Sequence, residues 1–285
     1  MFISDFYNLY KKNGLDSKII DAFRNIIYSH FKKYGRKFPF RENITPYNVL
    51  VSEIMLQQTQ TGAVSEKFLK FITLFPDFNT LNQAPLDDVI KAWHGLGYNR
   101  RAIALKKIAE KVIKDYNGEL PVFLNILEDL PQIGHNTASS IISFAFNKPT
   151  VFIETNIRRV FIYFFFPNKK NVKDKEILPL IENVLDKENP RKWYYALMDY
   201  GVMLKKTHPE LNKRSAHYKK QAAFKGSNRE IRGNILKLLL DRGEILERDL
   251  IEKFKIESER LNKILNQLTK EGFITRNNDL FKFSK

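Results

Sequence analysis

The residues with the clearest capacity for chemistry lie in the stretch from Leu130 to Val160. A turn centred on Gly134 precedes a helical pattern, and Glu154 follows as a lone carboxylate inside an apolar run. A glycine-centred turn that opens a helix presents backbone N–H groups to a phosphate. An acid that follows such a turn could act on the molecule whose phosphate the turn holds. The stretch therefore predicts an enzyme that acts on a nucleic-acid backbone or base.

A second candidate acid, Glu53, stands between apolar residues in the segment Val51–Gln60, VSEIMLQQTQ. Burial in a cleft would favour the protonated carboxyl that a general acid needs at neutral pH. The alternative is an acid at a helix N-terminus, where the helix dipole stabilises its negative charge. Leu56, Gln57 and Gln58 follow about one turn later. Leucine can wedge into a base step and glutamine can hydrogen-bond to base edges, so the segment predicts an acid beside residues that probe a duplex.

Two further motifs suggest contacts with nucleic acid. The segment Trp93–Ala102, WHGLGYNRRA, places Tyr98 and Arg100 after a Gly-x-Gly turn. The ring could stack on a base beside cations that bind phosphate, although a loop with a packed tyrosine fits the motif equally well. The segment Leu130–Ala138, LPQIGHNTA, has the pattern of a helix-hairpin-helix. Such a hairpin binds phosphate through backbone N–H groups and reads no bases.

The charge of the chain favours a polyanionic partner. The 285 residues include 48 lysines and arginines against 32 aspartates and glutamates, a formal net charge of +16. Lysine and arginine near phosphates gain by releasing condensed counterions, which indicates nucleic acid. The alternative is a self-repelling surface without such a partner. The chain length suggests about two domains.

The residue types that are missing exclude several kinds of site. The sequence has no cysteine, which excludes disulfides, Cys-ligated zinc and thiolate-held iron–sulfur clusters. The five histidines lack the spacing of a metal site, so we expect no metal and no other cofactor. No apolar run reaches the roughly 18 residues of a membrane span, and the N-terminus does not resemble a signal peptide. We expect a cytoplasmic, nucleoid-associated monomer.

Hydrophobic periodicity predicts an all-α body. Apolar residues recur with helical spacing over most of residues 17–225, and prolines punctuate the gaps. Residues 205–225 are strongly basic and lack a clean period, which predicts an extended segment or linker. After Gly226, three helical patterns and two strands around Asn277–Asp279 predict a winged helix-turn-helix unit. We expect this unit to contact DNA, the alternative being a structural or protein-binding cap.

The motifs, in this order and spacing, resemble the helix-hairpin-helix (HhH-GPD, endonuclease III) superfamily of DNA glycosylases. SEIMLQQTQ, APLDDVIKAWHGLGYNRRA and MDYGVM (residues 198–203) are most similar to MutY-type adenine glycosylases. The resemblance covers residues 18–221 and implies a two-lobed helical fold. A six-helix lobe with the helix-hairpin-helix would span residues 31–149, and the other lobe would combine residues 1–30 and 150–225. The winged helix-turn-helix would occupy residues 226–285.

The resemblance also implies roles for the candidate residues. Glu53 stands where the family places the acid that protonates the flipped purine. Glu154 stands where the family keeps an aspartate that stabilises the oxocarbenium-like sugar, and Asn156 matches the family's asparagine. Base removal by two carboxylates follows the logic of glycoside cleavage. The predicted DNA- or base-binding residues are Leu56, Gln57, Gln58, Tyr98, Arg100, Gln132, Gly134, His135, Asn136 and Thr137.

The activity predicted in this way is that of a monofunctional DNA glycosylase of base excision repair. Its partner would be double-stranded DNA, and it would hydrolyse the N-glycosidic bond of adenine mispaired with 8-oxoguanine or G. Asn136 stands where lyase-competent members carry lysine, so no Schiff base with the sugar is expected. Two alternatives stay open: a glycosylase for T or U opposite G, and a non-catalytic protein that binds damaged DNA.

Departures from the family pattern carry expectations of their own. Glu154 replaces an aspartate, and its extra methylene extends the carboxylate by about 1.5 Å. Gln132 replaces the first hairpin glycine, which has a steric cost if the turn needs a positive φ. The winged-helix-like unit stands in place of the C-terminal domain that recognises 8-oxoguanine in MutY-type enzymes. The four cluster cysteines of those enzymes are replaced by Lys205, Asn212, Ser215 and Gln221.

Overall fold

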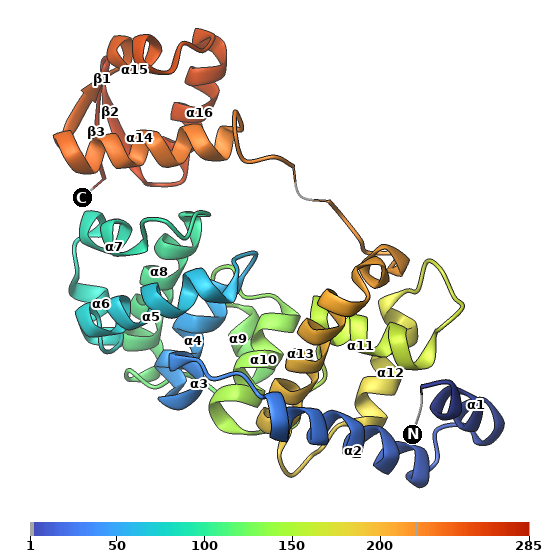
Figure 1. Ribbon diagram of the computed structural model, residues 1–285. Helices are drawn as coiled ribbons and strands as arrows, with labels where there is room; N and C mark the ends of the chain where they lie inside the picture. The colour runs from blue at the N-terminus through green and yellow to red at the C-terminus, as the bar shows by residue number, and fades with distance from the viewer. Residues whose placement is uncertain (1–2, 221, 285) are drawn as a thin grey trace. The chain divides into compact units, whose positions relative to one another are not determined.

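The computed structural model describes residues 3–220 and 222–284 of the chain (Figure 1). Its contacts form two units, Met1–Leu50 with Pro121–Lys220 and Val51–Leu120 with Gln221–Lys285. Apart from one isolated β-bridge, the regular structure described before residue 244 is helical, which confirms the predicted all-α body. The grouping puts residues 121–149 with the terminal helices, whereas the sequence put them with residues 31–120. The predicted lobe boundaries stay a prediction.

The helices of the first unit surround a core of aromatic side chains. α11 packs along α13 (Figure 1), and Phe23 lies 5.6 Å from Phe161 and 5.9 Å from Trp193 between ring centroids. Such tilted and edge-on pairs each add about 0.5–1.5 kcal/mol beyond area burial. This core fixes the direction of α11, which begins just after Glu154. The helices are α1 (Ile3–Asn13), α2 (Ser17–Tyr34), α3 (Pro39–Glu42), α9 (Leu124–Glu128), α10 (His135–Phe146), α11 (Thr155–Phe165), α12 (Asp174–Val184), α13 (Pro190–Thr207) and the 3₁₀ helix η1 (Pro209–Arg214).

The second unit begins within α4 (Pro46–Leu56) and continues through α5 (Thr61–Leu74), α6 (Phe78–Gln83), α7 (Leu86–Trp93) and α8 (Arg100–Tyr116). The core-facing stripe of α8 follows helical spacing. The ring of Trp93 packs edge-on against Phe71 with centroids 5.8 Å apart. These contacts place the turn between α7 and α8, which carries Tyr98. The buried apolar residues of α8 are Ala102, Ala104, Leu105, Ile108, Ala109 and Val112.

Residues 226–284, here called the C-terminal module, combine helices with a small sheet. The sheet is antiparallel with strand order β1-β3-β2, and Ile245 of β1 pairs with Phe281 of β3. The predicted three helices and the turn at Asn277–Asp279 are confirmed, whereas β1 was missed because three residues are too few to show alternation. The winged helix-turn-helix class stays a prediction. The elements are α14 (Asn228–Arg242), β1 (Glu244–Leu246), α15 (Glu247–Phe254), α16 (Ser258–Lys270), β2 (Ile274–Asn277) and β3 (Leu280–Phe283).

The basic segment 205–225 is not extended throughout, which corrects the prediction from sequence. α13 continues to Thr207, and η1 follows over Pro209–Arg214. Leu211 is buried, and the Arg214 guanidinium donates to the backbone oxygens of Phe166 and Lys169. These contacts stabilise a compact turn. The charge pattern of the sequence does not show the backbone oxygens that accept these hydrogen bonds.

The helices were also compared with the requirements for a membrane span. Among residues 3–220 and 222–284, no helix combines the length and the apolar character that a membrane span requires.

Candidate active site

The predicted site residues fall into two sets, and each set is described within its own unit. Glu154, Asn156 and the residues of the hairpin belong to the first unit. Glu53 and the residues from Leu56 to Arg100 belong to the second unit. The roles predicted for these residues stay predictions, and the structure gives the surroundings of each.

Glu154 caps the N-terminus of α11 with its own side chain. Its Oε1 accepts hydrogen bonds from the backbone N–H groups of Asn156 and Ile157, both at 2.8 Å. Such N–H groups have no partner inside the helix, and a side-chain acceptor satisfies them. Aspartate is the more usual residue at this position. Here the longer side chain folds back, so the extra methylene does not carry the carboxylate away from α11.

Asn156 holds the second oxygen of that carboxylate. Its Nδ2 donates to Oε2 of Glu154 at 3.1 Å, and its Oδ1 accepts from Nη1 of Arg159 at 2.8 Å. Among the hydrogen bonds of the described residues, Oε1 accepts two and Oε2 accepts one. Since each carboxylate oxygen has two acceptor positions, Oε2 can also accept from a water or a substrate. Two of the three predicted catalytic residues therefore lie in direct contact.

Arg159 extends this chain of contacts and was not identified from the sequence. Its side chain is buried, and Nη1 also donates to the backbone oxygen of Gly201 at 2.5 Å. A Cβ at residue 201 would lie 2.3 Å from the backbone oxygen of Asn156, so only glycine lets α13 approach α11 this closely. A charged residue inside the apolar pattern of α11 is the signal that could have revealed Arg159.

The same MDYGVM motif carries a buried acid with a structural task. Asp199 accepts hydrogen bonds from Nε of Arg36 at 2.8 Å and from Nη2 of Arg41 at 3.1 Å. It also accepts from the backbone N–H of Arg36 at 2.7 Å. The motif thus ties the loop after α2 to α13, and its glycine brings α13 to Asn156.

The surroundings of Glu154 act on its protonation in two directions. Burial, the largest effect, raises the pKa of Glu154 above its ordinary value of 4.5. The backbone donors at Asn156 and Ile157 and the charges of Arg159 and Arg158 act to lower the pKa, and burial prevails. Glu154 is therefore a carboxyl group that takes up a proton at a higher pH than an exposed glutamate.

The hairpin between α9 and α10 has the left-handed residue that the sequence raised as a possibility. Gln132 has φ +60°, so a side chain stands where a glycine fits without strain. Gly134 itself has φ −96° and is the N-cap of α10. The first turn of α10 presents backbone N–H groups beyond this cap, as a phosphate-binding helix N-terminus requires. The phosphate site at this turn stays a prediction.

Three other predicted residues of the hairpin are engaged within the first unit. The Nδ1 atom of His135 lies 2.7 Å from Oε1 of Glu128, across the hairpin. The Oδ1 atom of Asn136 accepts from the backbone N–H of Ile153 at 3.1 Å, which links the start of α10 to the residue before Glu154. The backbone oxygen of Thr137 accepts from Ser140 at 3.0 Å. Asn136 therefore positions the segment that leads into Glu154.

In the second unit, Arg101 holds the two loops that carry the predicted duplex-probing residues. Its buried guanidinium donates to backbone oxygens at the end of α4 and after it, and to others in the turn after α7. Burial lowers the pKa of Arg101 to about 10, so it stays charged at neutral pH. The sequence singled out Arg100 and missed Arg101, because adjacent arginines look alike. The acceptors are the backbone oxygens of Ile54, Met55, Gln57, Leu96 and Gly97, and Oγ1 of Thr59.

Backbone strain gathers in the loops expected to meet DNA. Gln58 has φ +56°, Tyr98 has φ +47° and Gln132 has φ +60°. Most other described non-glycine residues with positive φ are asparagines, which adopt this conformation more readily. Left-handed backbone at a glutamine or tyrosine costs free energy, and such strain collects at binding and catalytic sites. The DNA-binding role of these three loops stays a prediction.

Glu53 lies in the last turns of α4, partly buried. This position corrects one alternative from the sequence: Glu53 is not an N-terminal acid, so the helix dipole does not stabilise its charge there. Leu56 is the last residue of the helix, and Gln57 and Gln58 begin the loop that Arg101 holds. The candidate acid thus sits three residues before the predicted wedge, on a rigid element.

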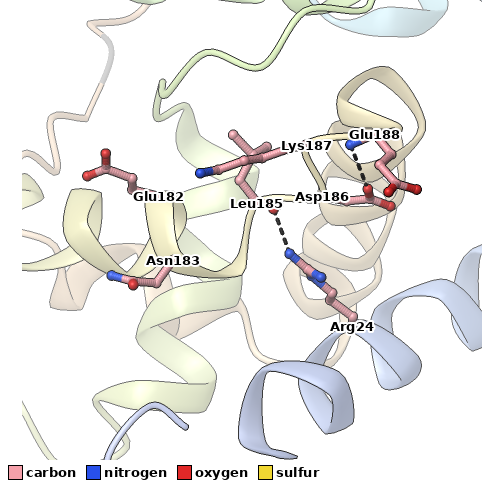
Figure 2. A pocket seen from close by; sticks show the side chains of 7 residues that line it. All are labelled: Arg24, Glu182, Asn183, Leu185, Asp186, Lys187 and Glu188. Atoms are coloured by element: carbon pink, nitrogen blue, oxygen red, sulfur yellow. Dashed lines mark hydrogen bonds between the residues drawn. The ribbon is translucent and has the colours of Figure 1, made fainter. Parts of the chain in front are cut away.

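A surface pocket in the first unit takes in none of the predicted site residues (Figure 2). The Arg24 guanidinium there donates to the backbone oxygens of Val184 at 3.0 Å and Leu185 at 2.6 Å. Asp186 accepts from the hydroxyl of Tyr28 at 2.6 Å. The polar groups of the pocket thus close the C-terminal end of α12. It is lined by Arg24, Glu182, Asn183, Leu185, Asp186, Lys187 and Glu188.

The positions expected for cluster ligands do not fit an iron–sulfur cluster. Lys205 lies in α13, Asn212 lies in η1, and Ser215 forms a β-bridge with Val172. None supplies a thiolate. Gln221 lies outside the described residues. Hydrogen bonds hold this segment instead, including those from Arg214, and the expectation of no cofactor stays a prediction.

Comparisons with known proteins identify relatives of two specificities. The model of the HhH-GPD superfamily of base excision DNA repair proteins matches residues 51–185. The chain is 36% identical over 194 residues to an adenine DNA glycosylase of Buchnera aphidicola subsp. Baizongia pistaciae, covering 67% of this chain and 55% of that protein. It is 29% identical over 186 residues to a thymine/uracil-DNA glycosylase of Methanothermobacter thermautotrophicus, covering 64% of this chain and 84% of that protein. The chain thus spans about half the length of the adenine-specific relatives.

Solved structures give the same fold. A thermostable thymine-DNA glycosylase matches with a TM-score of 0.58 and 26% identity, over 70% of this chain and 96% of that one. A trapped covalent intermediate of endonuclease III with DNA matches with a TM-score of 0.52 and 19% identity, over 74% of this chain and 91% of that one. Residues 51–185 carry the domain of the HhH-GPD superfamily of base excision DNA repair proteins.

Proposed function

We propose that this protein is a monofunctional DNA glycosylase that removes adenine mispaired with 8-oxoguanine or G. The observation that carries the proposal is Glu154, a carboxylate fixed by the N-terminus of α11 and by Asn156, in a chain 36% identical to an adenine DNA glycosylase. A fixed anion stabilises positive charge that develops on a sugar without having to reorganise.

In the proposed reaction, Glu53 gives a proton to the extruded base, which makes the base a better leaving group. The bond between the base and the sugar C1′ breaks, and the sugar becomes an oxocarbenium-like cation. Glu154 stabilises this cation, and water adds to C1′ and loses a proton, which leaves an abasic site. Extrusion of the base costs a few kcal/mol, which the predicted wedge and phosphate contacts must offset.

The amide at Asn136 supports a reaction that stops at the abasic site. A strand-cutting lyase needs an amine that forms a Schiff base with the sugar. Asn136 has no amine, and its side chain is engaged with the backbone of Ile153. We therefore expect intact strands until an external base cleaves them.

A second candidate is a glycosylase for T or U opposite G. The length of the match favours it. The chain covers 84% of the thymine/uracil-DNA glycosylase and 96% of the thermostable thymine-DNA glycosylase, but 55% of the adenine-specific relative.

One assay separates the candidates. The protein is incubated with labelled duplexes that contain A:8-oxoG, A:G, T:G, U:G or A:T, and each sample is divided and treated with or without hot alkali. Adenine removal is supported by alkali-dependent breaks at A:8-oxoG or A:G. Breaks only at T:G or U:G support the second candidate and reject the first. Binding without breaks on any duplex supports the non-catalytic alternative, and breaks without alkali contradict the monofunctional assignment.

A further inference from the structure

The C-terminal module contacts the turn that carries Tyr98, within the second unit. Nη1 of Arg229, in the first turn of α14, donates to the Tyr98 hydroxyl at 2.8 Å. Nη2 of the same guanidinium donates to the backbone oxygen of Ala222 at 2.7 Å. Arg100, two residues after Tyr98, donates to Glu271 at 2.5 Å, and Glu271 also accepts from Arg232. The turn, at Tyr98, and the first residue of α8, Arg100, are thus both bonded to the module.

The carboxylate that joins Arg100 to the module is partly shielded from water. The Glu271 side chain is 13% exposed and that of Arg232, its partner within the module, is 16% exposed, whereas the Arg100 side chain is 50% exposed. Burial acts to raise the pKa of Glu271, but the hydrogen bonds from Arg100 and Arg232 hold it below its ordinary value of 4.5. Glu271 is thus held in place within the module by Arg232, and Arg100 adds a partly exposed bond to it.

Two arginines hold Tyr98. Arg101 belongs to α8, and Arg229 belongs to the C-terminal module. The Arg229 guanidinium carbon lies 5.7 Å from the Tyr98 ring centroid, and that of Arg101 lies 5.5 Å from it. The backbone of Tyr98 is left-handed, at φ +47°. A strained residue keeps its conformation only where the surroundings over-determine it. Arg101 fixes the backbone of the turn, and Arg229 fixes the end of the side chain.

We propose that Arg229 is a positioning residue that sets the Tyr98 ring, so that the C-terminal module aims the aromatic side chain with which the lobe meets DNA. The role of Tyr98 rests on the proposed function, whereas the contact between Arg229 and Tyr98 does not. An aromatic ring aids base extrusion only if its direction is fixed, since a wedge must enter the base stack at one step. The module then acts on the rate of extrusion and not chiefly on affinity.

The test compares Arg229→Ala, Tyr98→Phe, the double variant and Arg229→Lys with a control, Arg248→Ala. Tyr98→Phe keeps the ring and removes the hydroxyl that Arg229 binds. Arg248 is an arginine of the same module whose side chain is 82% exposed, so it controls for the loss of one positive charge. The readouts are the single-turnover rate of base release, the Kd for the same duplex, and amide hydrogen exchange of residues 94–101 in the free protein.

We expect Arg229→Ala and Tyr98→Phe each to slow base release by about tenfold or more, since displacements near 1 Å can cost more than that. The Kd should stay within about twofold, because the Arg229 guanidinium is already engaged by Tyr98 and Ala222 and Tyr98→Phe removes no charge. The double variant should be no slower than either single variant. Arg229→Lys should restore part of the rate, and exchange at residues 94–101 should rise in Arg229→Ala but not in Arg248→Ala.

A wild-type rate for Arg229→Ala would overturn the proposal. So would a loss of affinity equal to that of Arg248→Ala with an unchanged rate, since the module would then only add charge near phosphates. If the wild-type protein releases no base, the proposed function fails, and hydrogen exchange alone decides the positioning contact. Unchanged exchange at residues 94–101 in Arg229→Ala would overturn it, and faster exchange confined to that variant would support it.

Discussion

Two helix ends carry the predicted chemistry, and they are built in opposite ways. At the N-terminus of α11, a carboxylate accepts backbone N–H groups, and that carboxylate is itself the candidate functional group. At the C-terminus of α4, the Arg101 guanidinium donates to backbone oxygens, and the candidate functional groups lie on the elements it holds. Each end satisfies the helix groups that the helix cannot satisfy itself.

The two helix ends differ in whether one side chain both holds the backbone and carries the predicted chemistry. At the α11 end the same side chain caps the helix and is expected to face the sugar, so a substitution of Glu154 disturbs both. At the α4 end, Arg101 supports the backbone and Glu53 is expected to move the proton. Structure and chemistry can therefore be removed one at a time in the second unit, but not at Glu154.

The largest effect is expected at Glu53. Glu53→Gln keeps the shape of the side chain and removes its proton, so the rate of base release should fall by about 10²–10⁴-fold. Affinity for the duplex, measured by gel shift, should stay within about twofold. A variant that still releases base at the wild-type rate would refute the assignment of Glu53 as the acid.

The next largest effect is expected in the pH dependence of base release, which tests the protonation of Glu154. Because the pKa of Glu154 is raised, the carboxyl becomes neutral at a pH above 4.5 and then cannot stabilise a cation. The rate should fall about tenfold for each pH unit below that raised pKa. Folding stability should follow the opposite trend: the contribution of Glu154 is full below pH 4.5 and is lost as the pH rises through the folded-state pKa. Glu154→Gln should lack the stability change in this window, and its persistence would contradict the argument.

Arg101 and its neighbour provide a matched pair for stability. Arg101→Met leaves several backbone oxygens buried without donors, so the free energy of unfolding should drop by about 3 kcal/mol. Arg100→Met loses a partly exposed ion pair and should cost no more than about 1 kcal/mol. Urea denaturation measures both values. Equal costs would show that the two loops do not depend on Arg101.

Two glycines test the close approach of α13 to α11. Gly201→Ala would push a methyl group against the backbone of Asn156, and overpacking of this kind costs about 1–3 kcal/mol. Gly233→Ala meets nothing within 4 Å inside α14 and should stabilise by about 0.5–1 kcal/mol. Thermal denaturation of both variants gives the comparison, and a tolerated Gly201→Ala would contradict the packing argument.

The smallest effect is expected at the hairpin. Gln132→Gly relieves a left-handed backbone but adds freedom to the unfolded chain, for a net gain of up to about 1 kcal/mol. Gln267→Gly, at an exposed position inside α16, should lose about 1 kcal/mol. Denaturation midpoints measure the difference. A destabilised Gln132→Gly would mean that the glutamine side chain contributes more than its backbone costs.

The sequence could reveal those residues whose roles depend on their neighbours in the chain. Glu154 stands out because a single acid in an apolar run is conspicuous, and the left-handed turn at Gln132 follows from the hairpin pattern. Arg101 and Gly201 could not be assigned, because their partners come from other helices. The contact between Arg229 and Tyr98 joins residues far apart in the chain, which no spacing rule connects.

The two errors have different origins. The helix-end alternative for Glu53 depended on where α4 begins, and element boundaries are the part of a pattern that propensity fixes least. The extended reading of residues 205–225 followed charge and missed the carbonyl acceptors that fold the segment around Arg214. Tertiary contacts decided the structure of that segment, whereas α4 begins at a local contact in which the Thr45 hydroxyl accepts from the backbone N–H of Asn48.

The single guanidinium of Arg101 also makes a mechanical connection. It bonds the loop after Leu56 and the turn before Tyr98 at the same time, through oxygens of Gln57 and Gly97. Neither loop can shift far without stretching bonds to a side chain that is packed in place. A force applied to one loop is therefore shared by the other, and the two loops move as one rigid unit.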